Sequence, residues 1–171
     1  MSIDTLMHRL YFTPFMPGAR TNQPDIGLHQ LELAIGAQLP PDYRHFLRHY
    51  GGITFHEDVI ADCLDQRIED GFVAIEGFFG FYIPQAAPAY DLLRNYTESR
   101  ATLPPLVFPI ALCPYGNQLL LNIGTGSGVL FVDHEEYSYN PDWSESMPDG
   151  VYVVQPSFSM LIATLKPFPA N

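Results

Sequence analysis

The chain has 171 residues, of which 47% are hydrophobic and 13% aromatic, a balance typical of a globular domain and unlike that of a disordered chain. Nineteen acidic residues against 8 basic ones give a formal net charge of −11, and Lys166 is the single lysine. This charge excludes nucleic acid and anionic membranes as partners, because both require clustered Lys and Arg.

The first third of the chain predicts a short opening helix, a loop and two longer helices. Residues 13–27 contain several chain breakers and no periodicity, which indicates a loop. From Leu28 apolar residues recur at helical spacing as far as Gly36, where the helix is expected to end. A second helix is expected from Pro41 to the Gly51-Gly52 pair, because proline suits a first turn and glycine a C-terminus. The apolar stripe of this second helix is Tyr43, Phe46, Leu47 and Tyr50.

The rest of the chain predicts strands, a third helix after Pro88 and a closing helix that Ser157 caps. The expected strands are 72–81, 106–113, 118–123, 129–133 and 151–154. Short turns between successive strands indicate antiparallel pairing. The predicted fold is therefore a single α+β domain over residues 1–171, an antiparallel sheet of about five to six strands with helices packed at both chain ends.

The cysteines and the N-terminus give no sign of secretion. Cys63 and Cys113 belong to no C-x-x-C pair, so both are expected to be small buried apolar residues and no metal or other cofactor is predicted. The opening residues lack a charged segment followed by a long apolar run, and no run is long enough to cross a membrane. A cytoplasmic protein is expected.

Two motifs resemble catalytic or metal-binding patterns but sit in the wrong context. Residues 124–128 (GTGSG) lead into a strand, whereas a phosphate-binding loop opens into a helix, so a hairpin turn is predicted. His45 and His49 have zinc-ligand spacing on a helix, but the neighbouring Arg44 disfavours a cation. An ordinary solvated helix face is the favoured interpretation.

The acidic run Asp133-His134-Glu135-Glu136 lies at a strand end, where alternating side chains point to opposite faces. An exposed acidic turn is favoured. A weak site for a hard cation, or a metal-assisted hydrolase using Asp133, His134 and Glu135, is the alternative from another functional class.

Acidic residues are concentrated in two stretches, 57–70 and 133–149, and in the second they are interleaved with aromatic residues. Exposed aromatics bordered by charge are a common composition of protein-binding surfaces, although the same aromatics are equally suited to covering the core under a long loop. The acidity itself fits solubility or the steering of a basic partner equally well. The candidate partner-binding residues are Asp133, His134, Glu135, Glu136, Tyr137, Tyr139, Trp143, Glu57, Asp58 and Asp62.

An ordered set of short motifs resembles the SUKH superfamily, the Smi/Knr group named after a yeast regulator of cell-wall synthesis. The resemblance covers about residues 28–166 and begins with L-x2-G-x2-LP-x-DY-x2-FL, starting at Leu33 and followed by Gly51-Gly52. Later pieces are the strands 75–80, 109–111 and 128–133 and the closing pattern from Ser157 to Leu165. The motif residues with an expected structural role are Leu39, Pro40, Tyr43, Phe46, Gly51, Gly52, Gly116, Asn117 and Phe158.

The resemblance implies a compact α+β domain without catalytic residues. In bacteria such domains often serve as immunity proteins that bind and neutralise a toxin, in many cases a nuclease, and an acidic chain suits a basic nuclease surface. We therefore expect a non-enzymatic protein-binding domain whose partner is a basic toxin. A regulatory scaffold like the fungal members is the alternative.

Overall fold

The computed structural model describes residues 2–15, 23–83, 85, 87–138, 140–144 and 146–169. Its helices are α1 (Ile3–Met7), α2 (Gln23–Ile35), α3 (Pro41–His49), α4 (Leu92–Ser99) and α5 (Phe158–Thr164), with the 3-10 turns η1 (Pro88–Tyr90) and η2 (Pro114–Gly116). Its strands are β1 (Phe12–Pro14), β2 (Ile53–Asp62), β3 (Phe72–Phe78), β4 (Val107–Leu112), β5 (Gln118–Asn122), β6 (Gly128–Val132), β7 (Val151–Gln155) and β8 (Lys166–Pro167). None of the helices in these ranges combines the length and the apolar character that a membrane span needs.

The strands form one antiparallel sheet in the order β1-β2-β3-β4-β5-β6-β7, and β8 pairs with the same strand, β2, as β1 does. The predicted α+β class and antiparallel sheet are confirmed, with eight strands where about five to six were expected. The additional strands are β1, β2 and β8. The Gly124–Gly128 segment is a turn between two antiparallel strands, as predicted, because Leu121 pairs with Val129 and Asn122 with Gly128.

The helical half of the prediction needs one correction. Residues 13–27 are not a single loop, because β1 includes Thr13 and Pro14 and α2 begins at Gln23. Pro24 is compatible with this earlier start, since the first turn of a helix has unpaired N–H groups in any case. The end of α2 is as predicted, with Gly36 at φ +77° directly after it.

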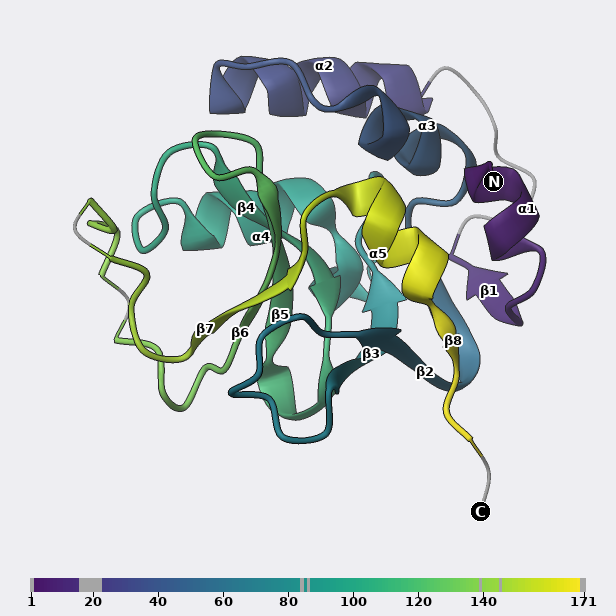
Figure 1. Cartoon of the computed structure of the whole chain (residues 1–171). Helices are drawn as coiled ribbons and strands as arrows, with labels where there is room; N and C mark the ends of the chain where they lie inside the picture. Colours follow the sequence, from purple (N-terminus) through teal and green to yellow (C-terminus); the bar gives the residue numbers. More distant parts are fainter. Residues whose placement is uncertain are drawn as a thin grey trace.

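The main hydrophobic core lies between the sheet and the helices α1, α2, α3 and α5, and Leu92 of α4 also belongs to it. Figure 1 shows how these helices are arranged around the sheet. Tyr43, Phe46 and Leu47 of α3 are buried there, as their spacing predicts. Phe158 of α5 packs against the rings of Tyr43 and Phe46 at centroid distances of 4.8 and 5.1 Å. The motif residues Tyr43, Phe46 and Phe158 are thus core residues.

A smaller core lies on the opposite side of the strands β4 to β7. Leu120, Leu130 and Val132 contribute to it, because alternate residues of a strand point to opposite faces. The chain between β6 and β7 (residues 133–150, Figure 1) contributes Tyr137 to this second core, and its Trp143 packs against the same core. This connection contains most of the predicted partner-binding residues.

The segment after β2 runs along the edge of β7 that faces away from β6. The amide groups of Leu64 and Asp65 donate to the carbonyls of Val154 and Val153 at 3.1 Å each. The outer edge of β7 is therefore covered by residues that directly follow β2. The two acidic stretches of the sequence approach each other at this edge.

Candidate functional site

Asp133 is the first residue of the acidic turn after β6, and its hydrogen bonds stabilise that turn. Its Oδ1 accepts a hydrogen bond from the Glu135 amide at 2.9 Å, and its backbone carbonyl accepts from the amides of Glu136 and Tyr137. This arrangement is an Asx turn, which aspartate favours because its short side chain reaches the backbone two residues ahead. Asp133 is half-buried, whereas Glu135 and Glu136 are exposed.

His134 is held by Asn117 of the turn before β5. The Asn117 Oδ1 accepts from the His134 backbone amide at 3.0 Å and lies 2.8 Å from the ring Nδ1. Because an amide oxygen only accepts, Nδ1 carries the proton in this contact. Gly116 lies beside the same ring, so the Gly116-Asn117 motif joins the start of β5 to the end of β6.

Tyr137 lies in the core and is therefore not a surface contact, which settles the choice left open by the sequence. Its side chain is 4% exposed, and its hydroxyl lies 2.6 Å from the Thr102 carbonyl and 2.9 Å from that of Asn140. Trp143 is half-buried and stands edge-on to Tyr137, with ring centroids 6.1 Å apart. Tyr139, predicted as a third contact aromatic, falls outside the described residues.

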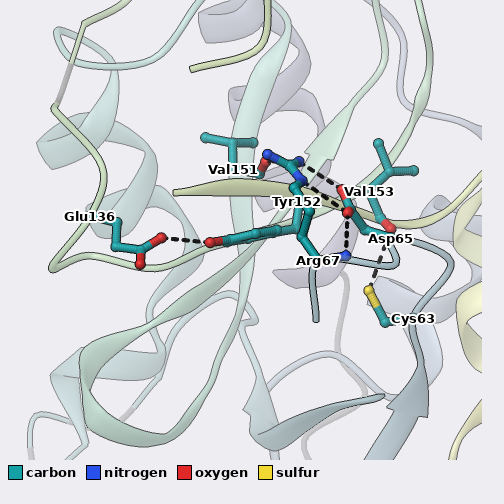
Figure 2. Close-up of polar contacts among 7 residues, drawn as sticks. All are labelled: Cys63, Asp65, Arg67, Glu136, Val151, Tyr152 and Val153. Carbon is teal, nitrogen blue, oxygen red and sulfur yellow. Dashed lines mark hydrogen bonds and ion pairs between the residues drawn. The ribbon is translucent and has the colours of Figure 1, made fainter. Parts of the chain in front are cut away.

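A polar cluster at the β7 edge joins the two acidic stretches (Figure 2). The carboxylate of Asp65 accepts from Arg67 Nε at 3.0 Å and Nη2 at 2.7 Å, and also from the backbone amide of Val153 at 3.3 Å. The same guanidinium donates to the Val151 carbonyl and lies 4.6 Å from the centre of the Tyr152 ring. We call Asp65, Arg67, Tyr152 and Glu136 the β7-edge cluster.

The β7-edge cluster changes the acidity of its members. Hydrogen bonds from Arg67 hold the pKa of Asp65 far below its ordinary value. The Tyr152 hydroxyl donates to Glu136 at 2.5 Å, and this bond raises the pKa of Tyr152 to about 12, because it favours the protonated phenol. Because Arg67 forms its ion pair with Asp65, the positive charge of Arg67 neutralises little of the negative charge on the other carboxylates nearby.

The residues predicted in the first acidic stretch divide into two groups. Asp62 is paired with Lys166 of β8 at 2.6 Å. Glu57 and Asp58 are exposed at an irregularity of β2, where its pairing with β3 shifts between Thr54 and Val59. Together with Glu76 of β3 they line a separate cleft of about 350 Å³. These three carboxylates do not belong to the β7-edge cluster.

The polar face of α3 binds neighbouring helices. His45 Nε2 lies 3.1 Å from Asp4 of α1, and Arg48 Nε donates to Asp25 of α2 at 2.7 Å. The rings of His45 and His49 are 4.4 Å apart. Across the described ranges, no three His, Cys, Asp or Glu side chains lie close enough to hold a metal ion, so the metal-assisted alternative has no ligand set among them.

Asp65, Arg67 and Tyr152 were not singled out from the sequence. Their association depends on a pairing between the segment after β2 and a strand nearly ninety positions later in the chain. The hydrogen bonds between Asp65 and the backbone of Val153 show this pairing. No local pattern encodes this contact. The single arginine in the first acidic stretch, Arg67, is the only local trace of it.

Comparison with known proteins gives two matches. The model of the SMI1 / KNR4 family (SUKH-1) matches residues 26–164. A curated relative, the SPbeta prophage-derived uncharacterized protein YokK of Bacillus subtilis (strain 168), is 29% identical over 133 residues, which are 70% of this chain. The chain spans 65% of the length of that relative. No solved structure matches the chain significantly. Because the family model covers most of the sequence, the chain belongs to the SMI1 / KNR4 family (SUKH-1).

Proposed function

We propose that this chain is a non-enzymatic immunity protein that binds and neutralises a basic toxin domain. The proposed contact surface is the exposed acidic part of residues 133–149 together with the β7-edge cluster. A nuclease is the toxin class that fits best, because a protein that holds nucleic acid must be basic where it does so.

The observation that carries the proposal is the distribution of unpaired carboxylates. Arg44, Arg48, Arg67, Arg94 and Lys166 each lie within ion-pair distance of a carboxylate. Among the described residues, in contrast, no basic side chain forms such a pair with Glu135, Asp142 or Asp149. An uncompensated field of this kind accelerates association with a cationic surface and disfavours like-charged partners.

Membership of the SUKH-1 family supports the same interpretation, because bacterial members of the superfamily often act in toxin immunity. The relative reported above is named as prophage-derived, and a bacterial prophage origin is compatible with an immunity role.

The test is rescue of growth. Each neighbouring gene product is expressed in a host cell with and without this chain, and any pair showing toxicity and rescue is purified for binding measurements. We expect one basic partner whose complex weakens between about 50 and 500 mM salt, since the Debye length shortens over that range. If the chain binds many proteins without rescuing growth, or binds none of the neighbouring gene products, the immunity role is wrong and the regulatory scaffold becomes the favoured function.

A matched pair of variants locates the surface. Glu135→Gln with Glu136→Gln raises the net charge by two, and the new amide at position 136 retains an acceptor for Tyr152. Gln30→Lys with Gln38→Lys makes the same change in net charge at exposed positions, the first in α2 and the second shortly after it. We expect the first pair alone to slow association about tenfold at low salt. Equal effects would show that net charge matters but that this surface does not.

A further inference from the structure

A mainly apolar groove of about 540 Å³ opens beside the acidic connection between β6 and β7. Val107, Leu130 and Val153 line it from β4, β6 and β7. The glycine turn 124–128 forms one side, and Trp143 and Met147 form another. The second core forms the floor of this groove, and the residues of the β7-edge cluster do not line it.

Internal hydrogen bonds fix both sides of the groove. The Asn122 side chain donates to the carbonyls of Thr125 and Gly126 at 3.2 and 3.3 Å, which holds the glycine turn. Trp143 Nε1 donates to the Asn140 carbonyl at 2.8 Å, which fixes the indole against Tyr137. A preformed groove binds more tightly than a flexible one, because little conformational freedom is lost on binding.

The groove combines an apolar lining with negative charge. Met147 is 39% exposed at its edge, although methionine normally buries its side chain. Asp142 is the one charged side chain among its described lining residues. Hydrogen bonds from the side chain and the backbone amide of Ser144 lower the pKa of Asp142. Protein interfaces place their anchor residues in well-packed apolar pockets that have a polar rim.

We propose that this groove receives one apolar side chain, of the size of leucine or phenylalanine, carried on a Lys- and Arg-rich loop of the protein partner. The inference rests on the proposed function and names the anchor point of the same interface. A second copy of this chain is disfavoured as the occupant, because two molecules of net charge −11 repel each other.

The test uses synthetic peptides and the full chain. One nine-residue peptide carries a central leucine flanked by lysine and arginine, a second has serine at the centre, and a third replaces the basic residues by glutamate. Trp143 is the single tryptophan of the chain, so its emission reports binding at the groove directly. Backbone amide NMR shifts identify the residues that respond.

We expect the basic leucine peptide to bind about tenfold more tightly than its serine twin, the difference that burial of one leucine side chain produces. Met147→Ser should weaken this binding about fivefold, because apolar contact is lost. Met160→Ser removes another exposed methionine, which lies outside the groove on α5 and is 48% exposed, and should leave peptide binding unchanged.

Equal affinity for the leucine and serine peptides, falling with salt, would overturn the groove and leave the acidic surface of the proposed function in place. Tight binding of the glutamate peptide would overturn the basic class of occupant. No binding of any peptide, or shifts confined to residues outside the groove, would overturn the inference, while growth rescue decides the immunity role independently.

Discussion

Asp65 and Arg67, two positions apart in the chain, form a two-pronged ion pair whose shortest contact, from Nη2 to Oδ2, is 2.7 Å. Asp65 is the buried partner, with 13% of its side chain exposed against 55% for Arg67. Both side chains also bond to the backbone of β7, at Val153 and Val151 respectively. The pair thus attaches the loop after β2 to the outer strand of the sheet.

Neutralising Asp65 should destabilise the fold measurably. We expect Asp65→Asn to lower the free energy of unfolding by about 1–3 kcal/mol, because the variant loses charge-assisted hydrogen bonds at a mostly buried position. Urea denaturation checks this. Glu98→Gln, which breaks an exposed ion pair with Arg94 on α4, is the control and should cost less than about 0.5 kcal/mol. Equal losses would mean that Asp65 does not hold the loop.

Asp65 should also shape the acid side of the stability profile. Its pKa is lower in the folded state than the ordinary value of about 4, so the folded state resists protonation. The unfolded chain binds this proton first, so the stability is present above pH 4 and is lost as the pH falls toward the folded pKa. We expect the urea midpoint to fall less steeply from pH 5 to pH 3 in Asp65→Asn than in the natural chain. Parallel profiles would contradict the assignment.

Tyr43 has a buried hydroxyl that no other described group satisfies. Burial raises the pKa of this tyrosine and leaves its O–H without compensation for lost hydration. Tyr43→Phe should therefore leave the free energy of unfolding unchanged or raise it by up to about 1 kcal/mol. Tyr43→Ala, which leaves a cavity beside Phe158, should lower it by about 3–5 kcal/mol. A loss above about 1 kcal/mol in Tyr43→Phe would show that the hydroxyl has a bound partner such as water.

The helices and the five strands β3 to β7 could be predicted from the sequence because their signals are local. Proline before α3 and the apolar spacing of Tyr43, Phe46 and Leu47 suffice to predict a buried helix face. The strand β2 was missed because its pairing shifts between Thr54 and Val59, which breaks the alternation and leaves three polar residues in succession. Its edge partners β1 and β8 are too short to carry a periodic signal.

The candidate site was predictable only in part, for the same reason. The exposed positions of Glu135 and Glu136 follow from an acidic turn after a strand, but the burial of Tyr137 depends on the Thr102 carbonyl, 35 positions earlier. The β7-edge cluster requires the contact between Asp65 and Val153, which are 88 positions apart. Contacts of this length arise from the topology of the sheet, and the residues that form them show no spacing of their own.

Asn117 should matter more for stability than its place in a surface turn indicates. Its Oδ1 serves both the backbone amide and the ring of His134, so Asn117→Ala leaves two half-buried donors without this acceptor. We expect a loss of about 1–3 kcal/mol, against about 0.5 kcal/mol or less for Thr125→Ala, an exposed position in the β5–β6 turn. The His134 amide should also exchange with solvent faster in Asn117→Ala, because its hydrogen bond is gone. Unchanged exchange at His134 with a normal urea midpoint would mean that the motif serves another purpose than joining β5 to β6.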